Sequence, residues 1–222
     1  MCKIHSFYIA LTARQSKRLS AIKEVHRQQC ALSRKEGVKH RIVSIDRPYI
    51  RRIVRGKESK RVEFGAKVNS IQIDGISFIE LHSFEAFNEG VRLKACVEYQ
   101  QKLTSIAVTR VGADTIYANN VNRRYCTENG ITSCFVRKVP KPKDVDVDGS
   151  VARRIIGTLL STVMTGSFGN QKQHYGVGWI ESRYSRSETL LLFFGIHMAN
   201  AATLVVRQLA IEEKERKRQN AG

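Results

Sequence analysis

The most informative stretch of this chain is Val111-Gly-Ala-Asp-Thr-Ile-Tyr-Ala118. It ends an apolar run over residues 106–111, which has the length of a short buried strand and follows a segment with helical periodicity. A strand that follows a helix in this way suits a β-α-β crossover. Asp114 comes directly after the strand and its Gly-Ala turn, where its carboxylate is either a metal ligand or the cap of the next turn.

Helices and strands are predicted before this stretch. Residues 9–34 suit an amphipathic helix, whose apolar positions recur at helical spacing: Leu11, Leu19, Ile22 and Val25. A basic, irregular and partly extended arm is expected over residues 35–62. Asp74-Gly75 is a strong signal for a two-residue hairpin turn between strands over 62–73 and 76–81.

The pattern continues through the rest of the chain. Residues 84–103 are predicted to form a helix with Ser83 as its N-cap. Gly130 is expected to end a second helix over 119–129. The remaining predicted elements are a strand over 131–136, a proline- and charge-rich linker over 138–149, and helices over about 151–168 and 188–218.

The charge of the chain is its most unusual bulk property. The 222 residues include 38 Lys and Arg against 20 Asp and Glu, which gives a formal net charge of +18 and a pI near 10.1. Such an excess attracts polyanions, so nucleic acid is the predicted partner. A solvated basic surface and a ribosome-associated protein are the alternatives. The length and the hydrophobic share of 42% suit one globular domain with a tail.

The cysteines and the apolar segments bear on the compartment. Five cysteines without a C-x-x-C pair favour reduced thiols in the cytoplasm over a disulfide framework or a zinc ribbon. The apolar run over 190–206 is the one stretch with the character of a membrane span. It contains His197 and Asn200 and is shorter than the roughly 20 apolar residues that a span needs. A buried helix and no membrane contact are therefore predicted.

Several short motifs follow one another from about residue 41 to residue 201. They are Arg41-Ile-Val-Ser-Ile-Asp-Arg-Pro-Tyr-Ile50, Ile53-Val-Arg-Gly-Lys57, Glu63-Phe-Gly-Ala-Lys-Val-Asn69, Ile73-Asp-Gly-Ile-Ser-Phe78, Ser83-Phe-Glu-Ala-Phe-Asn-Glu-Gly90, Val111-Gly-Ala-Asp-Thr-Ile-Tyr117, Gly166-Ser-Phe-Gly-Asn-Gln-Lys172 and Phe193-Phe-Gly-Ile-His-Met-Ala-Asn-Ala201. In this order they resemble the catalytic region of bacterial insertion-sequence transposases of the DDE class.

The resemblance implies a fold and a division of the chain. The fold is α/β: a ribonuclease-H-like mixed sheet flanked by helices, incomplete at its N-terminal strand, with an N-terminal helix before it. Residues 1–40 would be a helical segment at the end of an insertion region. Residues 41–206 would be a partial ribonuclease-H-like domain, and residues 207–222 a charged C-terminal tail.

The resemblance also assigns the chemistry. DNA cleavage and strand transfer by this class need two divalent ions, and Mg²⁺ prefers carboxylate oxygens. Asp114 matches the second acid of the motif and would be a metal ligand. Thr165 stands where the family has its glutamate, and a neutral hydroxyl weakens Mg²⁺ binding. The family's first acid lies on an upstream strand that no segment before Arg41 supplies, so Met1 is expected to start inside a longer ancestor.

The other carboxylates give no evident substitute for the two missing acids. A hairpin turn explains Asp74 better than metal binding does, and Asp46 is expected to be solvated. Glu181 lies about four helical turns beyond Thr165. Gly166-Ser-Phe-Gly169 lacks the pattern of a phosphate loop and follows no strand.

Basic residues close to these motifs are the predicted DNA contacts. They are Arg51, Arg52, Arg55 and Lys57 in the arm, and Lys172, His174 and Arg183 after the Gly-Ser-Phe-Gly segment. The N-terminal helix adds Arg14, Lys17, Arg18 and Lys23. Such clusters bind phosphates with little sequence information, and a solvated face is the alternative for each.

The resemblance implies a transposase of an insertion sequence that acts in DNA transposition and recombination, here as a truncated or degenerate copy. The alternative is a non-catalytic DNA-binding remnant that inhibits or modulates an intact transposase. Self-association, or association with an intact transposase, is a further expectation. The expected location is the cytoplasm, at the nucleoid. A basic RNA-binding protein is a third hypothesis, which no motif supports.

Overall fold

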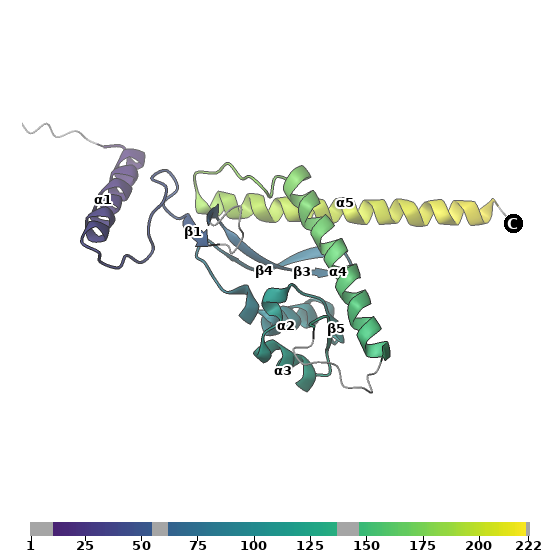
Figure 1. Cartoon of the computed structure of the whole chain (residues 1–222). Helices are drawn as coiled ribbons and strands as arrows, with labels where there is room; N and C mark the ends of the chain where they lie inside the picture. Colours follow the sequence, from purple (N-terminus) through teal and green to yellow (C-terminus); the bar gives the residue numbers. More distant parts are fainter. Residues whose placement is uncertain (1–10, 55–61, 137–146, 221–222) are drawn as a thin grey trace, which may run out of the picture. The chain divides into compact units, whose positions relative to one another are not determined.

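The computed structural model describes residues 11–54, 62–136 and 147–220, apart from some side chains inside one helix (Figure 1). The chain divides into two compact units. The first unit contains residues 1–67, 83–86 and 183–185, and the second contains residues 68–82, 87–182 and 186–222. The linker expected over 138–149 lies largely outside the described residues.

The first unit begins with helix α1, Ala13–Ser33. Thr12 and Gln15 form a capping box at its start, which satisfies two backbone N–H groups that the helix leaves open. The helix is confirmed, but the face predicted to be its apolar side is wrong. Its buried residues are Ala21, Gln28 and Ala31, whereas Leu11, Leu19 and Ile22 are exposed. The chain after α1 covers the side that carries Gln28, whose Oε1 accepts a hydrogen bond of 2.9 Å from the N–H of Ile42.

The first unit also contains a two-stranded antiparallel sheet. Strand β1, Arg51–Val54, pairs with β2, Val62–Gly65, and Arg52 lies directly opposite Phe64. The single strand predicted over 62–73 is divided, since β2 ends at Gly65 and β3, Lys67–Ile73, begins after Ala66. Gly65 has φ +143, a conformation that side chains rarely adopt, and this marks the break.

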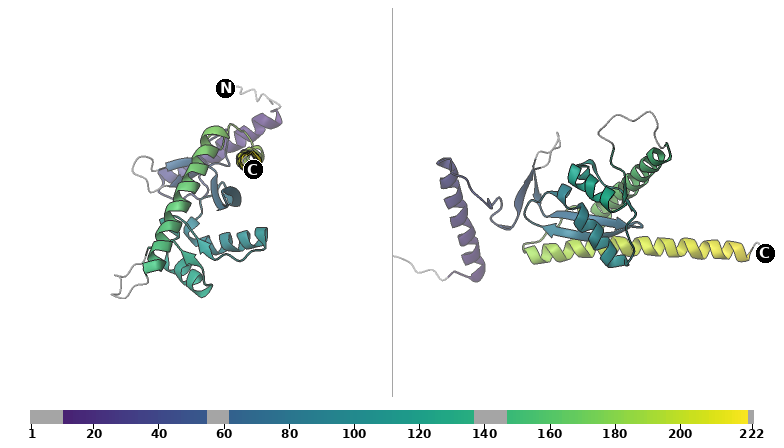
Figure 2. Two further views of the ribbon diagram at one scale, coloured as in Figure 1. Left: turned by 90° about the vertical axis from the view of Figure 1, so that its right-hand side faces the viewer. Right: turned by 90° about the horizontal axis from the view of Figure 1, so that it is seen from below.

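The second unit starts with a hairpin of β3 and β4, Ile76–Ser83. Asp74 and Gly75 both have positive φ, at 47° and 74°, as a type I′ turn requires, so the predicted hairpin is confirmed. Helix α5, Ser185–Gln219, runs alongside this hairpin and α4, Val147–His174, crosses the same part of the unit (Figures 1 and 2).

A smaller α/β layer follows the hairpin. Helix α2, Leu93–Thr104, begins nine residues later than predicted. Ser83 does not cap it, because the Ser83 hydroxyl accepts from Glu85 N, and Asn88 caps the short 3₁₀ helix η1, Glu89–Val91. Strand β5, Arg110–Val111, pairs in parallel with β6, Thr132–Ser133. Helix α3, Asn120–Glu128, lies between the two strands in the sequence. The core of this layer consists of Leu93, Val97, Val108, Cys126, Ile131 and Phe135.

The fold is therefore mixed α/β, with small antiparallel and parallel sheets. Among the described residues the strands pair as three separate two-stranded sheets, β1–β2, β3–β4 and β5–β6. The strands predicted over 106–111 and 131–136 are shorter than expected, and Ile106 is 69% exposed. Val108 and Ile131 nevertheless enter the core as buried strand residues would.

The buried helix predicted over 190–206 is buried on one side only. Helix α5 buries Leu192, Ile196 and Ala199, and it exposes Leu190 and Phe194 together with several later apolar residues. By length and composition α5 is the one described helix that could cross a membrane, and the core helix of a soluble protein passes the same test. The segment expected as a separate tail after residue 206 continues α5 without a break.

Candidate functional site

Asp114 lies where the parallel strand β5 has ended, at the cap position of the 3₁₀ helix η2, Thr115–Tyr117. Its side chain is exposed and makes no capping hydrogen bond. Ala113 beside it is fixed, since its N–H donates to Cys134 Sγ at 3.3 Å. The carboxylate therefore projects from an anchored segment and is available to a ligand, although it occupies a capping position.

A buried polar network holds the far end of the same segment. The Tyr117 hydroxyl donates to Asn69 Oδ1 on β3 at 2.6 Å, and Asn69 Nδ2 donates to Glu80 Oε2 on β4 at 2.8 Å. Arg92 forms an ion pair with Glu80. Burial, more than the nearby Glu80 charge, raises the pKa of Cys96 to about 11, so this thiol beside Asn69 stays protonated at neutral pH. Burial likewise raises the pKa of Tyr117.

Sequence reasoning missed this network. Glu80 lies between two apolar residues of a strand, Ile79-Glu-Leu81, and a charged residue at such a place is a usable signal, because a buried carboxylate needs a partner. The partners Arg92 and Tyr117 are distant in sequence, so the signal indicates that a partner exists but does not identify it.

Thr165 lies in the second half of α4. Before it, Gly157 faces Cys134, because a Cβ on that glycine would lie 3.7 Å from the Cys134 Cβ. After it, Gln171 Nε2 donates to the Ser77 hydroxyl on β4 at 2.8 Å. The segment with Asp114 likewise contacts Cys134 through Ala113 N and the β3–β4 hairpin through Tyr117. The segments that carry Asp114 and Thr165 thus each contact Cys134 and this hairpin.

The remaining acids occupy other roles. Asp74 pairs with Arg207 at 3.0 Å and sits in the hairpin turn, as expected. Asp46 is exposed and lies 3.4 Å from Arg18. Glu181 follows α4 and accepts a hydrogen bond from Trp179 Nε1. Among the described side chains no group of three His, Cys, Asp or Glu residues converges on a point where a metal ion would bind.

This donor set does not fit a two-metal centre. Two Mg²⁺ ions share several carboxylate oxygens in such a centre. Here Asp114 supplies one exposed carboxylate, and α4 carries a threonine, Thr165, where the resemblance places the family's glutamate. No catalytic step through Mg²⁺ follows from these residues.

Arg51, a predicted DNA contact, is engaged inside the first unit. Its guanidinium donates to Glu85 at 3.1 Å and to the Pro48 carbonyl at 2.6 Å, and its side chain is 18% exposed. Tyr49 packs edge-to-face on Phe84 next to it, with ring centroids 4.8 Å apart. Arg51 thus stabilises the chain before β1, and little of its charge is presented to solvent.

The other predicted contacts differ in accessibility. Arg52 is exposed on β1, on the face opposite to the buried Ile53. Lys172 and His174 are exposed in the last turn of α4, where a cation also stabilises the helix dipole, and Arg183 is exposed in the first unit. Arg55 and Lys57 lie outside the described residues.

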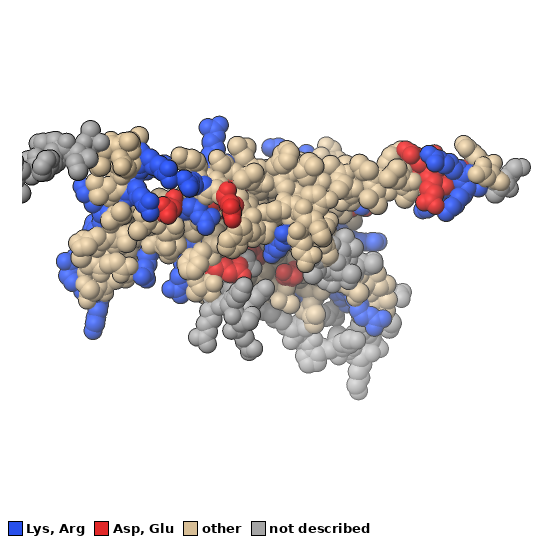
Figure 3. All heavy atoms as spheres, turned by 90° about the horizontal axis from the view of Figure 1, so that it is seen from above, with Lys and Arg blue, Asp and Glu red and all other residues tan. Residues whose placement is uncertain are grey.

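Helix α1 presents a basic surface. Arg14, Lys17 and Arg18 recur three and four residues apart and therefore project from one side of its first turns. Lys17 Nζ lies 5.6 Å from the centre of the Tyr184 ring. Figure 3 shows Lys and Arg side chains gathered over the part of the chain that contains α1. Lys23, from the same predicted cluster, is exposed on another side of the helix.

Comparisons with protein-family models, with curated proteins and with solved structures find no match for this chain. The resemblance to DDE transposases therefore rests on the sequence motifs alone.

Proposed function

We propose that this chain derives from an insertion-sequence transposase of the DDE class, with a ribonuclease-H-like ancestry, and that it binds DNA without cleaving it. The observation that carries the DNA-binding part is a surplus of exposed cations in the first unit. The exposed Lys and Arg residues that have no ion-pair partner among its described residues are Arg14, Lys17, Lys23, Lys35, Lys39, Arg41, Arg52 and Arg183.

The acids of the first unit do not neutralise this surplus. Glu24 pairs with Arg27 at 2.6 Å and Glu36 with Arg34 at 2.8 Å, while Glu85 accepts from both His40 and Arg51. Exposed pairs of this kind are worth little individually, but each one removes a negative charge from the field that an approaching phosphate meets. The remaining cations favour binding to a phosphate backbone with little base specificity.

The absence of cleavage follows from the ligand types. A threonine at position 165 supplies neither a negative charge nor a pair of oxygens, and Asp114 alone is a weak site for a hard divalent ion. Mg²⁺, which the ancestral chemistry would use, is expected to bind weakly here. Cytoplasmic DNA at the nucleoid is the proposed partner, and no membrane role is proposed.

Competition with an intact transposase is the biological consequence that we propose as the alternative role. A protein that binds the same DNA, or associates with the intact enzyme, would reduce transposition without any chemistry of its own. Co-expression with an intact relative and a transposition count would test this, and an unchanged count at high expression would exclude it.

DNA binding is tested by fluorescence anisotropy of a labelled duplex between about 50 and 200 mM salt. We expect affinity to fall steeply with salt. The triple substitution Arg14→Ala, Lys17→Ala and Lys23→Ala should reduce the slope of log K against log salt by about 0.9 for each DNA phosphate that these side chains neutralise. Alanine is the best helix former, so α1 should persist.

A matched control removes three exposed cations from the second unit: Lys94→Ala, Lys102→Ala and Arg124→Ala. The net charge changes by the same amount in both triple variants. If affinity falls equally in the two, net charge and not the α1 surface explains the binding. If the wild-type protein shows no salt-dependent binding, the proposed function is wrong.

A further inference from the structure

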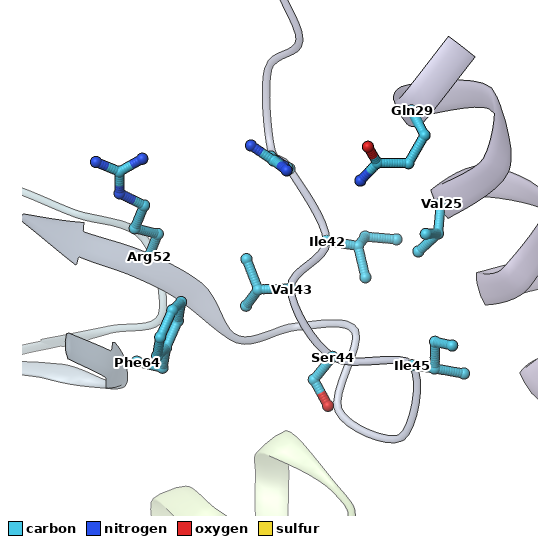
Figure 4. Close-up of a pocket in the computed structure, with 9 residues that line it drawn as sticks. Val25, Gln29, Ile42, Val43, Ser44, Ile45, Arg52 and Phe64 are labelled. Carbon is cyan, nitrogen blue, oxygen red and sulfur yellow. The ribbon is translucent and has the colours of Figure 1, made fainter. Parts of the chain in front are cut away.

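The first unit contains an open hollow of about 440 Å³ between α1, the following loop and the β1–β2 sheet. It is lined by Val25, Gln29, Arg41, Ile42, Val43, Ser44, Ile45, Arg52 and Phe64. Figure 4 shows Phe64 and Arg52 at the sheet, Val25 and Gln29 on the helix, and Ile42 and Val43 between them. All nine residues belong to the same compact unit.

An exposed aromatic ring stands at one wall of the hollow. Phe64 is 61% exposed and lies directly opposite Arg52 in the antiparallel register, so the two side chains are neighbours on one face of the sheet. A single exposed phenylalanine is ordinary on a protein surface. This one differs because Val43 and Ile45, which are also exposed, line the same hollow.

The described lining of the hollow carries positive charge. Among the described residues that line it, Arg41 and Arg52 are the charged ones and none is a carboxylate. Both guanidinium groups are exposed, and neither has an ion-pair partner among the described residues. An apolar floor with an open π face and two available guanidinium groups complements a flat, apolar base that carries an attached phosphate.

We propose that this hollow binds an unpaired nucleotide of single-stranded DNA, with the base stacked on Phe64 and the adjoining phosphates bound by Arg41 and Arg52. The proposal rests on the DNA-binding function proposed above and specifies the form of DNA that the site selects. The bases of a duplex are stacked inside the helix and cannot reach Phe64, so a duplex offers the site phosphates only. An unpaired strand offers both groups at once.

Binding of a single-stranded oligonucleotide of about 12 nucleotides and of the matching duplex, measured side by side, tests this. Phe64→Ala should weaken single-strand binding roughly 5- to 140-fold, the range expected when one base–aromatic stack is removed, and should leave duplex binding within about twofold. Phe64→Trp should retain or strengthen single-strand binding. Phe64→Leu should behave like Phe64→Ala, because it keeps apolar volume without a π face.

Leu19→Ala is the matched control, since Leu19 is an exposed apolar residue of the same unit that does not line the hollow. It should leave both affinities unchanged. Because Phe64 is largely exposed, its variants should fold, and a far-ultraviolet circular dichroism spectrum verifies this. A parallel oligoribonucleotide of the same sequence distinguishes the two kinds of single strand.

The outcomes separate the two proposals. Unchanged single-strand affinity in Phe64→Ala, or equal weakening for single strand and duplex, overturns the stacking site while the basic surface still stands. Salt-independent duplex binding overturns the basic surface and leaves the Phe64 comparison to decide the stacking site. Tighter, Phe64-dependent binding of the oligoribonucleotide would overturn the assignment to DNA. Single-strand binding that depends on an aromatic ring at position 64 supports it.

Discussion

Substitution of Gly195 by alanine should destabilise the second unit. Gly195 is buried on α5, where the helix passes the segment after α4. A Cβ at this position would lie 2.5 Å from the Tyr175 carbonyl oxygen and 2.9 Å from Val177 Cγ2. The Tyr175 carbonyl is backbone and is held near the end of α4, because Tyr175 N and Val177 N both donate to Gln171 O at 3.3 Å. The added methyl group thus has no flexible neighbour to displace.

The expected destabilisation is about 2 kcal/mol. Ordinary contact begins at 3.4 Å, so one backbone must move by about 0.9 Å to admit the new carbon. Overpacking of this kind costs about 1–3 kcal/mol, and the upper end applies because the obstacle is backbone. Alanine is favoured over glycine in a helix by about 1 kcal/mol, which offsets part of this cost.

Gly166→Ala and Gly169→Ala are the matched controls. Both glycines lie inside α4, and a Cβ at either would have no atom within 4 Å of it. Each substitution should stabilise the protein by up to about 1 kcal/mol. Urea unfolding followed by circular dichroism gives all three values. A Gly195→Ala variant as stable as the wild type would show that α5 does not approach residues 175–177 so closely.

Two further predictions concern the second unit. Asn200 Oδ1 accepts from Ser77 N at 2.9 Å and its Nδ2 donates to Ser77 O at 2.8 Å, so Asn200→Ala leaves two buried backbone groups without partners and should cost roughly 2–5 kcal/mol in urea unfolding. Gln208→Ala, at an exposed position on the same helix, should change the free energy of unfolding little. Equal destabilisation in the two variants would contradict a stabilising role of the Asn200–Ser77 hydrogen bonds. Burial lowers the pKa of His82, and the charge of Glu188 opposes this effect in part. The contribution of His82 to stability is therefore present above the pKa of the unfolded state, near 6.5, and is lost as pH falls through the lowered pKa of the folded state. His82→Gln should therefore flatten the decline of unfolding free energy below about pH 6.5, and parallel pH curves for wild type and variant would refute this.

Local signals in the sequence predicted the elements that depend on a few adjacent residues. Asp74-Gly75 specifies a hairpin turn because few dipeptides adopt positive φ at both positions. Gly130, with φ of 63°, follows α3 where expected. The predicted strand over 62–73 is divided at Gly65 by the backbone conformation of this one residue. The alternation of apolar and polar residues does not reveal that conformation.

Faces and partners were harder to predict, because they depend on segments that are distant in sequence. The buried side of α1 carries Ala21 and Gln28 because the loop after the helix lies there. The amide of Gln28 is polar, so a pattern of apolar residues does not identify this side as buried. Arg51 was a predicted DNA contact, but Glu85, 34 residues later, engages its guanidinium. Asp114 could be placed after a strand from its neighbours alone, whereas the Tyr117–Asn69 bond that fixes its segment spans 48 residues.

We propose that this chain derives from a transposase, binds DNA and does not cleave it. A nicking assay tests this proposal. Supercoiled plasmid is incubated with wild-type protein and with Asp114→Asn in Mg²⁺ and in Mn²⁺, at protein concentrations where anisotropy shows the DNA to be bound. We predict no nicking by the wild type above the level of Asp114→Asn in either metal. Metal-dependent nicking by the wild type that Asp114→Asn abolishes would show that the protein still cleaves DNA, and the proposal would be wrong.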